Sequence, residues 1–335
     1  MVTIKDVAAR AGVSTATVSR AMSGKGQVSE ATRLRVLAAV EDLGFVPSAV
    51  ARGLKTRRSH LIGLILPEIN DPFFAEIAAE AEEIASDMAF RVIVGTSLGH
   101  VDREMAHINT MLSYHVDGIM LSSALDPRPS IERIERGGVP CVLIDDVPIG
   151  RPVDGVQVDN VQGMKLLTDH LLDLGHRRIG VVAGRVPSTP AVERIEGYRT
   201  AFRSRDLPVP EELIRPGRWT VDTAEARTTE LLATHPDVTA LISMSTLITV
   251  GALRAARAAG RRIPEDLSVA SFDDVALAAE ITPFLTATRQ PVQAMCRELC
   301  RMLLGRIDGT RTGPAERVII PPTLHIRAST RQLQA

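Results

Sequence analysis

The apolar and polar positions of the first 45 residues follow the spacing of three short helices. Thr3 opens a T-x-x-D capping box, and small apolar residues then recur on one face of a helix expected over residues 4–11. Gly12 suits the left-handed turn that ends such a helix, while Ser14 can cap a second helix whose Val18 packs inward. This is the pattern of a helix-turn-helix.

The outward face of the second helix is short and polar. It consists of Thr15, Ala16, Ser19 and Arg20. A face of this size can enter the major groove of DNA and contact base edges. Two helices joined at a glycine also occur in α-rich proteins that bind no DNA, so the motif by itself leaves both interpretations open.

A third helix is expected from Ser29 to a turn at Gly44. Its apolar stripe is expected to consist of Leu34, Val36, Leu37, Val40 and Leu43. This stripe would complete a small core shared by all three helices.

A short segment, AVARGLKTRR, follows Pro47 and Ser48. It contains a glycine and has fewer than the roughly 12 residues that an isolated helix needs in water, so we expect it to be unstable alone. Leu54, a bulky apolar residue, lies there among four basic residues. An apolar wedge among cations suits insertion between base steps of the minor groove, with packing on the next domain as the alternative.

Beyond residue 58, short β-branched runs alternate with helical stretches, as in βαβ units with a parallel sheet. Strands are predicted at residues 61–66, 91–95, 118–121 and 141–144, and in a second set at 178–183, 240–243 and 268–272. Both sets open with a histidine and an Ile-Gly pair, in HLIGLI and HRRIGVVA. We therefore predict two similar doubly wound α/β subdomains, with the chain crossing between them near residues 159–161, 290 and 321–322.

Charge is divided unevenly along the chain. Residues 1–58 hold ten lysines and arginines against four acidic residues, whereas the rest holds 29 against 36. The basic residues 1–58 would attract DNA phosphates, and the acidic remainder would be mildly repelled by them. This favours binding to DNA through the N-terminal region. The 335 residues are too many for one core and fit two or three domains.

The common catalytic and metal-binding motifs are missing from the sequence. Walker, GxGxxG, GxSxG and HExxH patterns are not found, and the eight histidines have no ligand spacing. Cys141, Cys296 and Cys300 lack paired C-x-x-C spacing, and the last two are expected in the core. We therefore expect no enzyme activity, metal or cofactor. With no export signal and no apolar run near ~18 residues, we expect a cytoplasmic protein without membrane contact.

Residues at the carboxyl ends of the predicted strands mark a candidate ligand cleft, because open α/β sheets bind ligands there. They are Asp145 with Asp146, Asp273 with Asp274, and Phe73 with Phe74. The carboxylates can accept sugar hydroxyls, although one of each pair could instead cap a helix, and one phenylalanine could belong to the core. Trp219, the only tryptophan, suits stacking on a sugar or base, or packing between subdomains.

The chain resembles the lactose and purine repressor (LacI/GalR) family of bacterial transcription regulators. The resemblance rests on TIKDVAARAGVSTATVSRAMSG, VSEATRLRV, LGFVPSAVARGL and HLIGLILP, and it covers essentially the whole chain. It implies a headpiece that reads the major groove, a hinge helix formed in pairs by a homodimer at the centre of a palindromic operator, and a sensor built like the periplasmic sugar-binding proteins.

The resemblance also implies residue roles. Thr15, Ala16 and Arg20 match base-reading positions, and Leu54 matches a minor-groove lever. The expected DNA-binding set is Thr3, Ser14, Thr15, Ala16, Thr17, Ser19, Arg20, Ser29, Ala51, Leu54 and Lys55. The expected effector-binding set is Phe73, Phe74, Asp145, Arg194, Trp219, Asp273 and Gln290. From the sequence alone, the arginine of AVERIEGY could equally be a surface cation.

Three departures from the family pattern limit this transfer. Ser243, Met244, Ser245 and Thr246 stand where many members carry an Asn-Asp pair, and Pro190 stands where relatives often place a hydroxyl that contacts ligand. A buried site discriminates by which hydroxyls find partners, so the identity of the sugar stays open. The chain ends at ASTRQLQA without a leucine heptad, so we expect a dimer.

The expected organisation is a helix-turn-helix headpiece at 1–46, a hinge at 47–58 and a periplasmic-binding-protein-like effector domain at 59–335. Its N-subdomain is expected at about 60–159 and 291–320, and its C-subdomain at about 161–289 and 322–335. The expected function is a repressor whose operator affinity responds to a small polar effector, a sugar, sugar acid or related metabolite. A solute-binding protein or a sugar-handling enzyme on the same α/β core would leave the headpiece without a role.

Overall fold

The computed structural model describes residues 2–23, 27–45, 58–123, 125–148, 150, 152–275 and 284–333. Residues 1–59 and 60–335 form two compact units, which we call the headpiece and the sensor. The predicted hinge helix, with Ala51, Leu54 and Lys55, lies outside the described residues.

The headpiece contains the three helices that its sequence predicts. They are α1 (Ile4–Ala11), α2 (Thr15–Ser23) and α3 (Glu30–Leu43). The capping box of Thr3 and Asp6 is present, and Gly12 adopts the left-handed conformation at φ 66°. Val7, Val18 and Val36, one from each helix, are fully buried together. The small core therefore fixes how the three helices pack.

The apolar stripe predicted on α3 is partly wrong. Leu34 and Leu37 are 58% and 42% exposed, whereas Val36 and Ala39 are buried. At 3.6 residues per turn, positions 36, 39, 40 and 43 share one side of the helix, and position 34 lies on the opposite side. Three short helices cover only one stripe, so the other two leucines stay at the surface.

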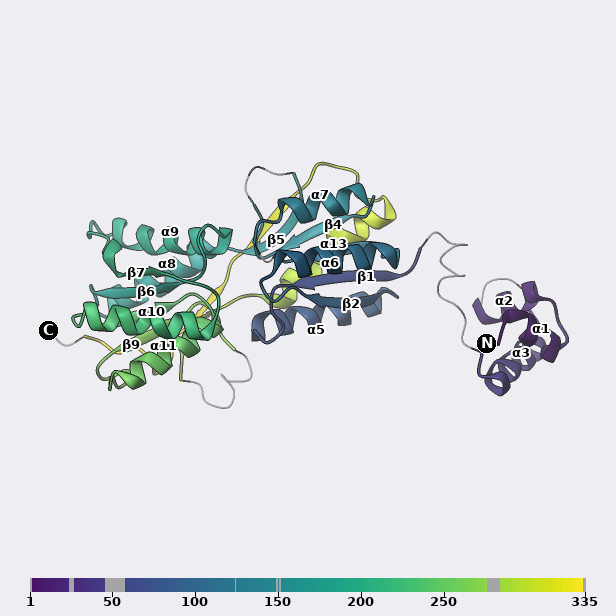
Figure 1. The fold of residues 1–335 in the computed structure, drawn as a ribbon, viewed down its shortest axis with the longest axis horizontal. Helices are drawn as coiled ribbons and strands as arrows, with labels where there is room; N and C mark the ends of the chain where they lie inside the picture. The colour runs from purple at the N-terminus through teal and green to yellow at the C-terminus, as the bar shows by residue number, and fades with distance from the viewer. Residues whose placement is uncertain are drawn as a thin grey trace. The chain divides into compact units, whose positions relative to one another are not determined.

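The first half of the sensor, the N-lobe, is a parallel six-stranded sheet in the order β11-β5-β4-β3-β1-β2. Its strands are β1 (Leu61–Leu66), β2 (Arg91–Thr96), β3 (Gly118–Leu121), β4 (Cys141–Ile144), β5 (Asp154–Val158) and β11 (Arg317–Ile320). Helices α5 (Pro72–Asp87) and α13 (Val292–Asp308) cover one face, and α6 (Val101–Ser113) and α7 (Arg128–Arg136) cover the other (Figure 1). Cys296 and Cys300 are buried in this core, as predicted.

The second half, the C-lobe, repeats this arrangement in the order β12-β10-β9-β8-β6-β7. Its strands are β6 (Ile179–Ala183), β7 (Ile214–Pro216), β8 (Ala240–Ser243), β9 (Ser268–Ser271), β10 (Thr286–Arg289) and β12 (Thr323–His325), of which β12 alone among these is antiparallel to its neighbour. Helices α8 (Asn160–Asp173) and α9 (Thr189–Arg203) pack on one face, and α10 (Val221–Thr234) and α11 (Thr246–Ala258) on the other; a 3-10 turn, η1, spans Glu211–Leu213.

The chain passes between the two sheets three times: from β5 to α8, from β10 to α13 and from β11 to β12. Each lobe is thus completed by a strand from the C-terminal part of the sequence. Strands β1, β3, β4 and β8 have their predicted bounds, whereas β5, β7, β10, β11 and β12 were not predicted. In the described part of the chain, every helix is too short or too polar to cross a membrane.

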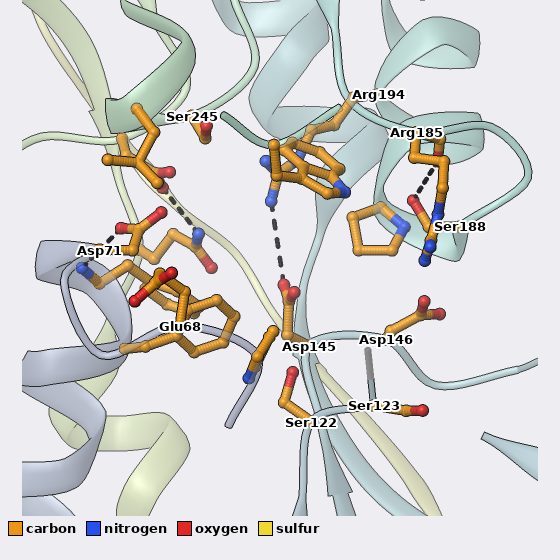
Figure 2. Close-up of a pocket in the computed structure, with 18 residues that line it drawn as sticks. Glu68, Asp71, Ser122, Ser123, Asp145, Asp146, Arg185, Ser188, Arg194 and Ser245 are labelled. Atoms are coloured by element: carbon orange, nitrogen blue, oxygen red, sulfur yellow. Dashed lines mark hydrogen bonds and ion pairs between the residues drawn. The ribbon is translucent and has the colours of Figure 1, made fainter. Parts of the chain in front are cut away.

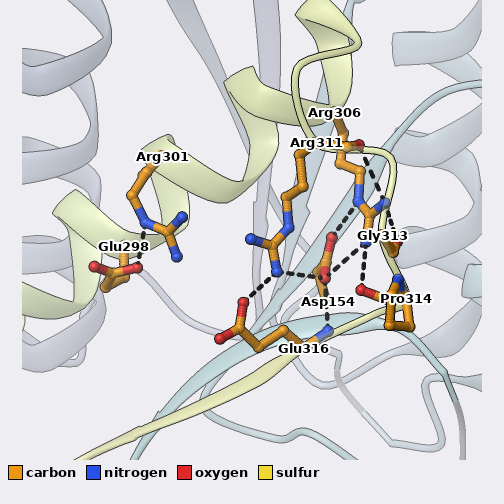
Figure 3. A network of polar contacts seen from close by, with 8 residues as sticks. All are labelled: Asp154, Glu298, Arg301, Arg306, Arg311, Gly313, Pro314 and Glu316. Carbon is orange, nitrogen blue, oxygen red and sulfur yellow. Dashed lines mark hydrogen bonds and ion pairs between the residues drawn. The ribbon is translucent and has the colours of Figure 1, made fainter.

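A buried carboxylate anchors β11 to β5 at the edge of the N-lobe sheet. Asp154 Oδ2 accepts Arg306 Nε at 2.7 Å, and its Oδ1 accepts the Glu316 backbone N–H at 2.8 Å. Arg311 lies 3.5 Å from the same carboxylate (Figure 3). These contacts hold the end of α13 and the start of β11 in register with the sheet.

Candidate functional site

A cavity of about 670 Å³, partly open to solvent, lies where the strands of both lobes end. Its lining comprises Pro67, Glu68, Asp71, Phe73, Phe74, Ser122, Ser123, Asp145, Asp146, Arg185, Ser188, Pro190, Arg194, Trp219, Ser245, Leu247, Asp273 and Gln290. All seven residues expected to bind effector belong to this set (Figure 2). Four of them, Phe73, Phe74, Asp145 and Asp273, were predicted from their places after strands, and Arg194, Trp219 and Gln290 from the family resemblance.

Arg194 lies at the centre of the cavity, on α9, and is only 3% exposed. Its Nε donates to Asn160 Oδ1 at 2.8 Å, and its Nη1 donates to the Met244 carbonyl. Its Nη2 lies 3.9 Å from Asp145 Oδ1 (Figure 2). The guanidinium carbon is 3.7 Å from the centre of the Phe272 ring. Arg194 is therefore a buried, oriented donor and not a surface cation.

The acceptors around Arg194 are incompletely used. Gln290 Nε2 donates to Asp273 Oδ1 at 2.7 Å, which leaves Gln290 Oε1 buried without a hydrogen bond. Asp145 Oδ1 is likewise buried and accepts no hydrogen bond. A buried acceptor without a donor costs free energy. Hydroxyl groups of a ligand would supply the missing donors.

Burial also changes the charge of this cavity. It raises the pKa of Asp145 to about 6 and that of Asp273 to about 8, while the nearby Arg194 guanidinium opposes both shifts. Burial raises the pKa of Asp71 and Asp146 as well. Burial thus favours the protonated form of Asp273 at neutral pH, and a protonated carboxyl group can both donate and accept hydrogen bonds.

Trp219 packs within the C-lobe, and stacking of its ring on a ligand stays a prediction. The half-buried ring packs against the core of the C-lobe and also lines the cavity. It lies directly over Gly184, where an added Cβ would come within 2.2 Å of the ring. Glycine at that position is what lets the flat ring lie against the backbone.

Phe73 belongs to the core, as the sequence allowed for one of the two phenylalanines, and Phe74 is only partly buried. Phe73 is 8% exposed and belongs to the N-lobe core, while Phe74 packs partly against it, with the ring centroids 5.0 Å apart. Asp71 caps α5 by accepting the Phe73 N–H at 3.1 Å. This cap starts α5 at the cavity, so that both rings reach its wall.

The second carboxylate of each strand-end pair has its own role. Asp146 Oδ1 accepts the backbone N–H of Thr189 at 3.2 Å, so it contacts the start of α9 from the opposite lobe. Asp274 pairs with Arg327 at 2.7 Å within the C-lobe and does not line the cavity. Asp146 therefore accepts a hydrogen bond at the start of a helix, as the alternative predicted, but this helix is α9 of the other lobe.

Several residues that line the cavity were not predicted from the sequence. Ser122 and Ser123 follow β3, and Arg185 follows β6, so the strand-end rule could have found them. Glu68 follows β1 in the same way, whereas Ser188 and Leu247 carry no such signal. Of the departures from the family pattern, Ser245 lines the cavity and caps α11, whereas Ser243 is buried and hydrogen-bonds Thr249.

The headpiece presents the expected face of α2. Thr15, Ala16 and Arg20 are exposed, and Thr17 and Ser19 are half-buried. Ser14 Oγ accepts the Thr17 N–H at 3.1 Å, and Ser29 accepts the Thr32 N–H at 3.4 Å. Thr3, Ser14 and Ser29 are exposed at helix starts, where their neighbouring backbone N–H groups can face phosphates.

The described residues contain no group of three or more histidine, cysteine or acidic side chains arranged to hold a metal ion. Two parts of the chain match known families. Residues 3–48 match "Bacterial regulatory proteins, lacI family", and residues 168–330 match "Periplasmic binding protein-like domain".

Curated relatives and solved structures match over nearly the full length. The HTH-type transcriptional regulator CelR of Thermobifida fusca is 37% identical, over 98% of this chain and 98% of its own. The solved complex of CelR with cellobiose has a TM-score of 0.74 at 35% identity, covering 98% of this chain and 100% of that one. The lac repressor dimer bound to operator and the anti-inducer ONPF has a TM-score of 0.86 at 27% identity, covering 98% and 99%.

Proposed function

Because the chain belongs to the lacI family of bacterial regulatory proteins, we propose that it is a dimeric repressor whose affinity for a palindromic operator is set by a sugar bound in the sensor cavity. The observation that carries this proposal is the buried Arg194, which faces Asp145 Oδ1, a buried acceptor without a hydrogen bond, at 3.9 Å. A hydroxyl group of a polyhydroxylated ligand can accept from the guanidinium and donate to the carboxyl oxygen.

The ligand class that fits best is a disaccharide. Figure 2 shows polar side chains at both ends of the cavity, with Asp71 and Ser245 at one end and Arg185 and Ser188 at the other. The cellobiose complex of CelR, a relative of similar length, supports the same ligand class.

Calorimetric titration of the full-length protein with cellobiose, glucose and ribose tests this ligand class. We expect cellobiose to bind most tightly. Arg185→Ala should remove most of its advantage over glucose, because the second ring would lose its polar partner. Arg199→Ala, which alters an ion pair with Glu211 elsewhere on the C-lobe, is the matched control. Equal affinity for glucose and cellobiose in the wild type would contradict the disaccharide assignment.

The regulatory step follows from cleft closure. A ligand that prefers one closure angle shifts the population of the sensor toward it, and in a dimer this moves the two hinge segments relative to each other. Operator affinity measured by fluorescence anisotropy should therefore change when cellobiose is added. Unchanged operator affinity at saturating cellobiose would rule out this control.

The DNA side of the proposal assigns base contacts to Thr15, Ala16 and Arg20, and a minor-groove lever to Leu54. Arg20→Ala should weaken operator binding by about 1–3 kcal/mol and relax the sequence preference. Leu54→Ala should reduce both operator affinity and the DNA bend. Hydrogen exchange at residues 48–55 should slow when operator is added. Equal protection with and without DNA would contradict the conditional hinge helix.

A further inference from the structure

Arg194 is tied to the N-lobe by a set of polar contacts behind the cavity. Asn160, the first residue of α8, lies where the chain has just left the N-lobe sheet, and it is fully buried. Its Oδ1 accepts Arg194 Nε at 2.8 Å, and its Nδ2 donates to Glu193 Oε2 at 3.0 Å. One amide thus connects the arginine of the cavity to its neighbour on α9.

Glu193, in turn, binds two side chains of the N-lobe. Its Oε1 accepts Arg317 Nη2 at 2.7 Å, and its Oε2 accepts Gln157 Nε2 at 2.9 Å. Arg317 also donates twice to Gln157 Oε1, at 2.7 and 3.0 Å. The Arg317 and Glu193 side chains are 26% and 18% exposed, so solvent screens this ion pair less than a surface pair.

The N-lobe side of these contacts is held firmly. Gln157 lies on β5, where it is 1% exposed, and Arg317 is the first residue of β11. The residue before it, Glu316, donates its backbone N–H to the buried Asp154, and that carboxylate also accepts from Arg306. The position of Arg317 is therefore set by the N-lobe sheet.

The donor and acceptor atoms of these side chains fix which way each amide group is turned. A carboxylate only accepts, so the amide N–H groups of Asn160 and Gln157 must point toward Glu193. Asn160 Oδ1 is then turned toward Arg194, whose Nε–H only donates. The orientation of the arginine in the cavity thus depends on a carboxylate that is itself held by the opposite lobe.

We propose that Glu193 and Arg317 are positioning residues, and that their ion pair between the lobes fixes Asn160 and, through it, the effector-facing Arg194. The bond from Arg317 to Glu193 orients the guanidinium of Arg194 through Asn160, and the same bonds carry a displacement of Arg194 back to the lobe contact. Only the choice of ligand in the test below rests on the proposed function.

Exchange of the Arg194 Nε–H with water reports its hydrogen bond to Asn160 without any ligand. The experiment uses full-length protein labelled with ¹⁵N-arginine, and the signal is assigned by its loss in Arg194→Lys. We expect Glu193→Gln and Arg317→Ala each to speed this exchange about tenfold, the change that one charge-assisted hydrogen bond controls. Arg317→Lys, which keeps the charge, should have a smaller effect.

Arg199→Ala is the matched control for Arg317→Ala. Arg199 lies on the same helix as Glu193, is 33% exposed and pairs with Glu211 at 2.8 Å, but this pair stays within the C-lobe. Its loss should change the exchange less than about twofold, as for a surface pair. In the Glu193→Gln background, Arg317→Ala should add almost nothing, because both variants break one path.

Cellobiose affinity gives the second readout. Glu193→Gln and Arg317→Ala should both weaken cellobiose binding, while Arg199→Ala should not. If the wild type binds no cellobiose but the exchange changes as expected, the disaccharide proposal fails and the positioning role stands. If Arg317→Ala speeds exchange no more than Arg199→Ala, or if its effect adds in full to that of Glu193→Gln, the positioning role is wrong.

Discussion

The two lobes of the sensor share one strand order but give opposite charges to the cavity between them. The N-lobe wall holds four carboxylates, Glu68, Asp71, Asp145 and Asp146, and the C-lobe wall holds Arg185, Arg194 and one carboxylate, Asp273. The fold is therefore duplicated, while the chemistry at the strand ends has diverged. The N-lobe wall is rich in carboxyl groups, and the C-lobe wall holds the arginine donors and the Trp219 ring.

This division explains how a neutral, hydroxyl-rich ligand can favour a closed cleft. Arg194 Nη2 and Asp145 Oδ1 lie 3.9 Å apart, beyond good hydrogen-bond distance. A hydroxyl between such groups can accept from the guanidinium and donate to the carboxylate. Four experiments test this difference between the two walls, and they follow from the largest expected effect to the smallest.

Removing the central cation should have the largest effect. Arg194→Ala removes the donors to Asn160 Oδ1 and to the Met244 carbonyl, and each buried acceptor left without a donor costs about 1–3 kcal/mol. Urea unfolding should show that loss, and calorimetry should show cellobiose affinity falling at least about 100-fold. An affinity within threefold of the wild type would contradict the role of Arg194.

The stability of the ligand-free protein should fall as the pH rises. The pKa values of Asp145 and Asp273 are raised to about 6 and about 8, so the folded state holds protons that the unfolded chain releases near pH 4. The stabilisation from each group is fully present below its unfolded pKa near 4, falls by about 1.4 kcal/mol per pH unit from there to its folded pKa, and is lost above it.

Chemical unfolding from pH 4 to pH 9 measures this slope. Asp273→Asn should remove the slope between pH 6 and pH 8, and between pH 4 and pH 6 it should leave only the share that Asp145 contributes. The difference between the two proteins isolates Asp273 from histidines that titrate in the same range. Parallel profiles for the variant and the wild type would show that Asp273 is not protonated in the folded state.

Gly184→Ala should displace the Trp219 ring from its position on the C-lobe. Its new Cβ would come within 2.2 Å of the Trp219 ring, and such overpacking costs about 1–3 kcal/mol. Because Trp219 is the only tryptophan, its fluorescence reports the displacement directly. Cellobiose binding should weaken in parallel. Gly313→Ala, which meets open space, is the control, and an unchanged spectrum in Gly184→Ala would contradict this account.

The smallest effect is expected at the mouth of the cavity. Asp146→Asn keeps the shape but replaces a charge that can face the first N–H groups of α9, where Asp146 now accepts from Thr189. We expect cellobiose affinity to change about two- to fivefold, the scale of one helix-end charge. A loss as large as that of Arg194→Ala would mean that Asp146 contacts the ligand itself.

The sequence predicted the fold more fully than the site. Hydrophobic runs such as LIGLIL and GIML identify buried parallel strands because both faces of such a sheet are covered. Strands β10, β11 and β12 escaped prediction, since TATR, RVII and TLH are short and mix polar with apolar residues. On α3, apolar residues alone did not reveal which side the small core covers.

The sequence by itself determined the helix caps, the central strands and the residues at strand ends, because each depends on neighbours a few positions away. It could not determine which of those residues meet. Asn160, Glu193 and Arg317 carry no local signal, and only the crossing of the chain between two sheets brings them within hydrogen-bond distance. Burial, which raises the pKa of Asp145 and Asp273, is likewise a property of the assembled lobes.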